Sequence, residues 1–119
     1  MKTLLDTNFL LVPIHFRIDI YDRIGSELCT LDKCMEELEK MSKERTKTGI
    51  EAKAALLLAK MKGVKIIKAE EREADRAIIT AAKKGNYAVA TNDKALIKAL
   101  KKEGLRVLRL RQKKLIAEE

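Results

Sequence analysis

The sequence contains no tryptophan, one proline, one histidine and two cysteines, and these shortages exclude several kinds of protein. Cys29 and Cys34 form no CxxC pattern, so we expect reduced core residues rather than a zinc site or a disulfide framework. The few Phe and Tyr residues are too scattered to form a base-stacking platform. No signal peptide or membrane span is visible, so we expect a soluble, cytoplasmic protein.

What is present is aliphatic and charged. The 119 residues suit one domain, 1–119, whose core is built from Leu, Ile, Val, Ala and Met. Lys and Arg number 26 against 18 Asp and Glu, which gives a net charge of +8. Such an excess favours a polyanionic partner. The alternative is a surface rich in ion pairs, as in thermophilic proteins.

Apolar segments alternate with helical patterns across short joints that contain glycine. The expected strands are 3–5, 28–31, 64–67, 87–90 and 105–110. The expected helices are 9–12, 19–28, 32–42, 48–62, 70–84 and 94–103, with Asn8 and Asp32 as helix caps. Pro13 interrupts the first helix, which is therefore either short or resumes as its continuation at 19–28. Helix 48–62 is apolar on nearly all sides and is expected to be buried. This alternation predicts an α/β fold, a three-layer α/β/α sandwich with a central parallel sheet.

Two aspartates directly follow expected strands. Asp6 comes after 3–5, and Asp93 follows 87–90. In open parallel sheets functional groups gather beyond the carboxyl ends of the strands, so both are candidate site residues. The alternative is a purely structural role, because aspartate is a favoured N-cap of the helix that comes next.

Helical phase adds two more carboxylates. In helix 32–42, Glu37 lies one turn from both Cys34 and Met41, at the edge of the apolar stripe, whereas Glu36 lies on the opposite side. In helix 70–84, Asp75 falls on the apolar flank. A carboxylate on such a flank is costly unless it is paired or bound to a metal. Glu71 is the competing candidate, with a favourable charge at the helix N-terminus as its alternative role.

Gathered carboxylates repel one another unless a cation neutralises them. The ligands available are hard oxygens, with no suitable histidine and no cysteine cluster, so Mg²⁺ or Mn²⁺ is the expected cation. In-line hydrolysis of a phosphodiester is the chemistry that uses such a cluster.

Four segments, in order, resemble the motifs of PIN-domain nucleases: 4–11, 37–38, 73–78 and 90–93. The resemblance covers essentially the whole chain. It implies a Mg²⁺- or Mn²⁺-dependent endoribonuclease. It further implies an acidic metal site whose catalytic, metal-binding residues are Asp6, Glu37, Asp75 and Asp93. Asn8 and Thr91 match the supporting polar positions of the family.

Residues 13–20 are similar to archaeal relatives of the PIN nucleases that process precursor ribosomal RNA. We therefore favour an RNA-processing enzyme over a toxin of a toxin–antitoxin pair. A catalytically silent RNA-binding scaffold in ribosome assembly is the third interpretation. The resemblance makes RNA, a second copy of the chain in a homodimer and ribosome-assembly factors the expected partners.

The C-terminal region is strongly basic. Arg109, Arg111, Lys113 and Lys114 are candidates for a phosphate-binding strip beside the site. The alternative is an edge strand that its cationic side chains protect against aggregation. His15 lies in an expected loop near the first motif, and we assign it no required role, because metal-assisted hydrolysis needs no histidine base.

Overall fold

The two central strands are short apolar segments that lie side by side in parallel. β1 (Lys2–Leu5) pairs with β4 (Ala88–Ala90), and Leu4 lies opposite Val89. Both of these side chains are fully buried, as expected for strands covered by helices on both faces. The computed structural model describes residues 2–25, 27–112 and 115–118.

Six strands form one sheet in the order β3-β2-β1-β4-β5-β6. The remaining strands are β2 (Glu27–Leu31), β3 (Lys65–Ile67), β5 (Val107–Arg111) and β6 (Leu115–Glu118). β3, β2, β1, β4 and β5 run parallel, so their carboxyl ends share one edge. The antiparallel edge strand β6 was not expected from the sequence; Gln112, with a φ of 53°, lies in the connection from β5.

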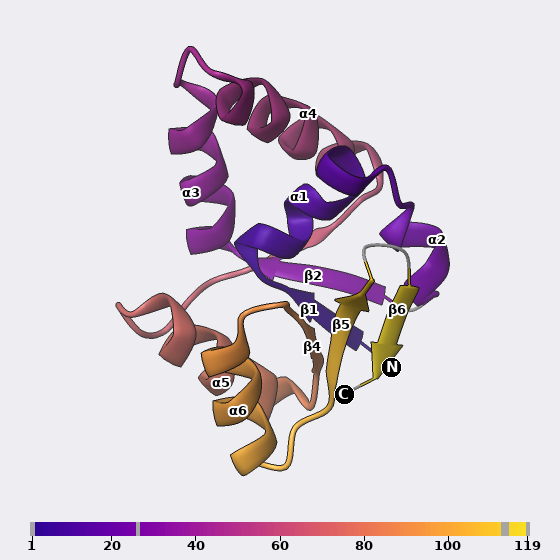
Figure 1. Cartoon of the computed structure of the whole chain (residues 1–119). Helices are drawn as coiled ribbons and strands as arrows, with labels where there is room; N and C mark the ends of the chain where they lie inside the picture. The colour runs from indigo at the N-terminus through magenta and orange to yellow at the C-terminus, as the bar shows by residue number, and fades with distance from the viewer. Residues whose placement is uncertain (1, 26, 113–114, 119) are drawn as a thin grey trace.

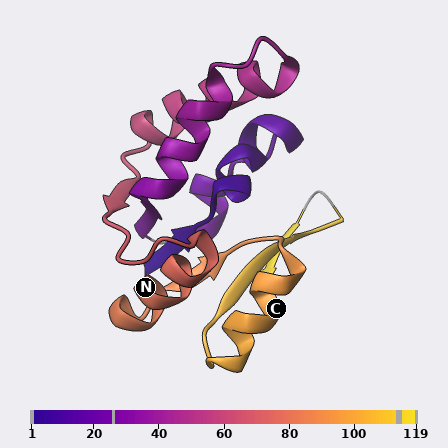
Figure 2. The same cartoon turned by 90° about the vertical axis from the view of Figure 1, so that its left-hand side faces the viewer.

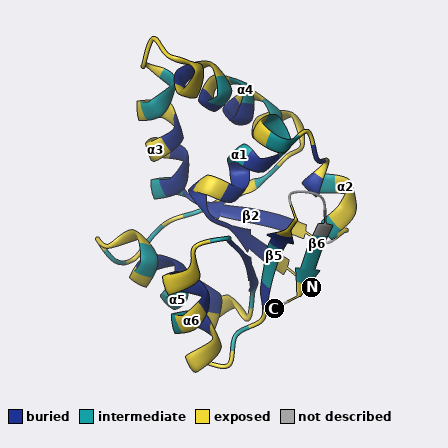
Figure 3. Cartoon of the chain, in the orientation of Figure 1, coloured by how far each residue is buried: buried dark blue, intermediate teal, exposed yellow. Residues whose placement is uncertain are grey.

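Helices cover both faces of the sheet, which confirms the predicted three-layer sandwich (Figures 1 and 2). The helices are α1 (Thr7–Phe16), α2 (Ile20–Ile24), α3 (Asp32–Ser42), α4 (Lys47–Met61), α5 (Ala74–Gly85) and α6 (Lys94–Lys102). α1, α3 and α4 lie on one side of the sheet, and α5 and α6 lie on the other. The buried residues concentrate on the strands and on the inward helix faces (Figure 3).

α1 corrects one expectation, because Pro13 lies inside this continuous helix and does not interrupt it. Proline removes one backbone hydrogen bond and crowds the preceding turn. Phe9, Leu10 and Val12 are buried in the core, and we attribute the continued helix to this packing. The chain leaves α1 at Arg17, with a φ of 56°, and α2 forms a separate helix that ends before Gly25.

α4 is less buried than its composition suggests. Ile50, Leu57 and Met61 are exposed, because only one side of the helix packs on α1 and α3. In the described part of the chain, none of the helices has the length and apolar character that a membrane crossing requires.

The structure also corrects the two helix caps that were expected at Asn8 and Asp32. Asp6, not Asn8, is the N-cap of α1. Asp32 is the first residue of α3, and its Oδ1 accepts from the backbone N–H groups of Lys33 and Ala69, which ties α3 to the segment before α5.

Candidate active site

Asp6 lies where β1 ends and α1 begins, and its side chain is held by two donors. Oδ1 accepts from the backbone N–H of Phe9 at 2.8 Å, and Oδ2 accepts from the hydroxyl of Thr91 at 2.5 Å. The residue is 7% exposed. The N-cap role considered as an alternative is therefore confirmed. It leaves further lone pairs on the carboxylate, so capping does not exclude a second function.

Asp93 stands in the equivalent place after β4. Its Oδ1 accepts from the backbone N–H of Leu96 at 3.1 Å, so it is the N-cap of α6. Its own backbone N–H donates to the Thr91 hydroxyl oxygen at 3.1 Å. Thr91 is fully buried. One threonine side chain thus contacts both aspartates, the supporting position that the sequence indicated.

Glu37 reaches the same region from α3. The residue is exposed overall, yet its Oε2 accepts from the Thr7 hydroxyl at 3.0 Å. Thr7 follows Asp6 directly and is buried. Thr7 was not recognised from the sequence, where it has no signal beyond its place within the first motif.

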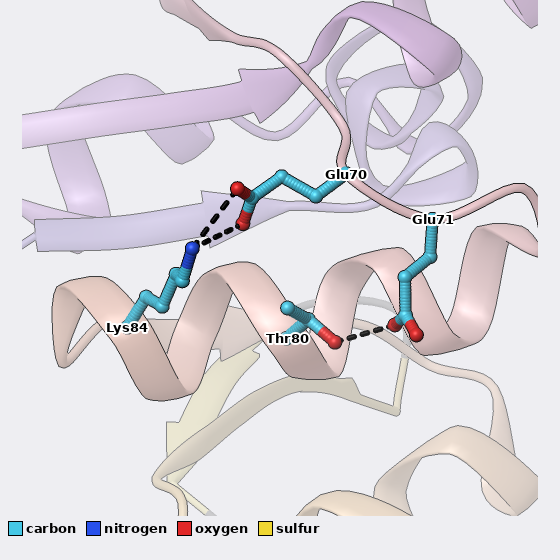
Figure 4. A network of polar contacts seen from close by, with 4 residues as sticks. All are labelled: Glu70, Glu71, Thr80 and Lys84. Carbon is cyan, nitrogen blue, oxygen red and sulfur yellow. Dashed lines mark hydrogen bonds and ion pairs between the residues drawn. The ribbon is translucent and has the colours of Figure 1, made fainter.

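Asp75 lies in the first turn of α5 and is half-buried. Its competitor Glu71 precedes the helix and instead accepts from the hydroxyl of Thr80, as Figure 4 shows. Beside it, Lys84 pairs with Glu70 at 2.8 Å. Glu70 and Lys84 line a cavity of about 740 Å³. They pair with each other, and the described residues that line this cavity include no second carboxylate.

The four predicted acids line one cavity of about 230 Å³, which we call the carboxylate cavity. Asn8 stands at its rim, exposed, and Thr7, Cys34, Ala74 and Ile78 complete the lining. Asp6, Glu37 and Asp93 follow the neighbouring strands β1, β2 and β4 and therefore meet at the carboxyl edge of the sheet, where the first turn of α5 adds Asp75.

Burial and mutual repulsion affect the ionisation of this cluster. The pKa of Asp6 is raised from 3.8 to about 6, mainly by desolvation and also by the charges of Asp93 and Asp75; its hydrogen bonds with Thr91 and Phe9 oppose this rise. The pKa of Asp75 is also raised, first by desolvation and then by Asp93 and Glu73. The aspartates thus interact electrostatically.

The donor set fits a hard divalent cation, since four carboxylates surround one small cavity. Among the described residues, however, no three His, Cys, Asp or Glu side chains are arranged so as to hold a metal as they stand. Carboxylates repel one another, so a converged arrangement is unfavourable without a cation. To hold a cation jointly, the four carboxylates would have to move closer together.

The structure describes two of the four residues that the sequence predicts to contact RNA. Arg109 is half-buried and Arg111 is exposed on β5. Lys113 and Lys114 lie outside the described residues. β5 lies between β4 and β6, so the edge-strand alternative is wrong for these arginines.

His15 is at the end of α1, not in a loop, and its Nδ1 lies 3.1 Å from Glu51 Oε2.

Similarity to known proteins extends over nearly the whole chain. A family model described as "PIN like domain" matches residues 3–113. "Ribonuclease VapC4" of Methanocaldococcus jannaschii is 38% identical over 121 residues, which cover 95% of this chain and 92% of the relative.

Two solved structures share the fold. The PIN domain endonuclease Utp24 superposes with a TM-score of 0.82 at 28% identity, over 99% of this chain and 90% of the other. A domain of a functionally unknown protein from Methanocaldococcus jannaschii has a TM-score of 0.67 at 20% identity, over 99% and 94% of the two chains. The second shows likeness of fold alone.

Proposed function

Because the chain belongs to the PIN-like domain family, we propose that it is a divalent-cation-dependent endoribonuclease that hydrolyses RNA phosphodiester bonds in the carboxylate cavity. The observation that supports this most strongly is the convergence of four acids from four separate segments on one cavity. A relative named as a ribonuclease and a similar structure named as an endonuclease support the same activity.

In this proposal Asp6, Glu37, Asp75 and Asp93 hold Mg²⁺ or Mn²⁺. When bound, such a cation would supply a water of lowered pKa as the nucleophile and would neutralise charge that develops on the phosphate. Thr91 orients Asp6 and the backbone of Asp93, and Thr7 orients Glu37. Asn8, which also lines the cavity, would act as a supporting polar residue beside the acids.

Amide substitution tests this assignment. Asp6→Asn and Asp93→Asn keep an oxygen that can accept the capping hydrogen bond while they remove the charge. We expect each to lower kcat by more than about a hundredfold, which exceeds the usual cost of losing a group that only orients a metal ligand. The assay follows Mn²⁺-dependent cleavage of labelled RNA.

The matched control is Glu36→Gln, which removes an exposed carboxylate next to Glu37 that does not line the cavity. It should cut RNA at the wild-type rate. Cleavage at the original rate by either aspartate variant would overturn the assignment. A crystal soaked in Mn²⁺ should show anomalous density between the four acids.

For the biological role we propose processing of precursor ribosomal RNA, supported by the resemblance of residues 13–20, and for the assembly a homodimer. A toxin instead predicts growth arrest on expression and relief by a neighbouring partner gene. A silent scaffold predicts RNA binding with no metal-dependent cleavage, and stronger binding when the acids become amides.

A further inference from the structure

A second cavity, of about 310 Å³, adjoins the carboxylate cavity. α1, the first turns of α4 and the loop that carries Asn92 enclose it, and we call it the side pocket. Asn8 lines both cavities, and Asn92 directly precedes Asp93. A chain whose phosphate entered the carboxylate cavity would therefore pass beside this pocket.

One side of the pocket is apolar and partly aromatic. Leu11, Val12 and Phe16 line this side; Leu11 and Phe16 are half-buried and keep part of their surface accessible, whereas Val12 is buried beneath them in the core. The rings of His15 and Phe16 meet edge to face, with centroids 4.6 Å apart and planes at 88°. A flat heteroaromatic ring can stack on such a surface, as unpaired RNA bases stack on aromatic and histidine side chains.

Hydrogen-bonding groups from α4 and from the loop that carries Asn92 line the rest of the pocket. The carboxylate of Glu51 lies 3.1 Å from His15, and the hydroxyl of Thr48 is beside it on α4. Asn92 Oδ1 accepts from the backbone N–H of Leu110 at 2.7 Å, which fixes the orientation of its amide group. Acceptors and donors around an apolar floor are what the edge of a nucleobase requires.

We propose that the side pocket binds one nucleobase of the RNA, belonging to a nucleotide next to the phosphate that is cut. This rests on the proposed function, which places the scissile phosphate in the carboxylate cavity. The volume is at the small end for ligand pockets, which suits a single ring system. The proposal differs from the sequence-based expectation that the scattered aromatic residues form no stacking surface, because α1 brings Phe16 and His15 together at this pocket.

Filling the pocket tests the proposal without removing core contacts. Thr48 is exposed at the start of α4, so Thr48→Trp adds a side chain over the pocket. The matched control is Ile50→Trp, which adds the same group on the same helix at a residue that does not line the pocket.

The substrates are a short single-stranded RNA and a series in which one nucleotide at a time is abasic. For the wild type, we expect one abasic position beside the cut to lower kcat/KM about tenfold, the usual effect of losing one stacked base. Thr48→Trp should lower kcat/KM for the intact RNA by a similar factor and be insensitive to that abasic position. Ile50→Trp should match the wild type.

Two results would overturn the proposal: no abasic position beside the cut affects the wild type, or the effects of Thr48→Trp and the abasic position multiply. The same series is also measured as RNA affinity on Asp6→Asn, which holds the RNA uncut. A chain that never cleaves RNA contradicts the proposed function. The affinity series still decides whether a single base occupies the side pocket.

Discussion

At the scale of single residues, Asp6 shows how a candidate active site reduces stability. The carboxylate is almost fully buried, and desolvation together with neighbouring aspartates raises its pKa to about 6. Because the pKa in the folded state lies above the ordinary value of 3.8, the folded protein holds an extra proton between about pH 4 and pH 6. The free energy of unfolding therefore falls as the pH rises through this window.

We expect Asp6→Asn to be more stable than the wild type at pH 8 in metal-free buffer. A pKa raised from 3.8 to about 6 corresponds to roughly 3 kcal/mol, and imperfect contacts of the amide with Thr91 should reduce the gain to about 1–2 kcal/mol. The gap should close as the pH falls below about 4, where the wild-type carboxyl is protonated. Urea unfolding across pH measures it. A less stable variant at pH 8, or a gap that does not change with pH, would contradict the prediction.

At the scale of elements, the close packing of α3 on α4 sets the position of Glu37 and of one wall of the side pocket. Gly49, in the first turn of α4, makes this packing possible. A Cβ there would lie 1.9 Å from the carbonyl oxygen of Glu44 and 3.3 Å from that of Met41. The backbone of the connection therefore approaches α4 at a distance that only glycine permits.

Gly49→Ala distinguishes this packing from local helix preference. Helix propensity alone predicts stabilisation by up to about 1 kcal/mol. Because backbone atoms must shift, we expect destabilisation by about 2–3 kcal/mol instead. Gly104→Ala is the comparison: its φ of 72° is unfavourable, but no atom lies within 4 Å, so it should cost only about 1 kcal/mol. A more stable Gly49→Ala would refute the packing argument; urea unfolding gives both values.

At the scale of the whole molecule, a net charge of +8 coexists with a cavity lined by four acids. Positive charge elsewhere can hold the RNA backbone while the cavity remains able to attract a cation. The carboxyl end of β5, with Arg111, lies at the same edge of the sheet as Asp93, and the Leu110–Asn92 hydrogen bond links β5 to that loop.

RNA affinity should therefore fall steeply with salt. For a single strand, each phosphate that a protein cation neutralises adds about 0.7 to the slope of log affinity against log salt. We expect Arg111→Gln to reduce the slope by about this amount, measured by fluorescence anisotropy on the uncut complex. Lys53→Gln, an exposed cation on α4, should leave the slope unchanged. Equal effects of the two substitutions would mean diffuse attraction rather than a local strip.

The sequence by itself determined the layered fold and the order of the acidic motifs. Strand and helix patterns are local, so the apolar segments around Leu4 and Val89 could be recognised from a few residues. The same locality explains the errors. Pro13 favours ending a helix, and only the buried neighbours of α1 show why the helix continues. β6 depends on its pairing with β5, which no short window contains.

Only the tertiary structure decided which side chains meet. The neighbouring positions of β1 and β4 bring Thr91 to Asp6, and α3 brings Glu37 to Thr7. The assignment of the four acids as metal ligands stays a prediction. The side pocket was invisible in the sequence, because its walls come from separate segments. A cavity is formed by the space between packed elements, and that space depends on their crossing and spacing rather than on the preferences of any one segment.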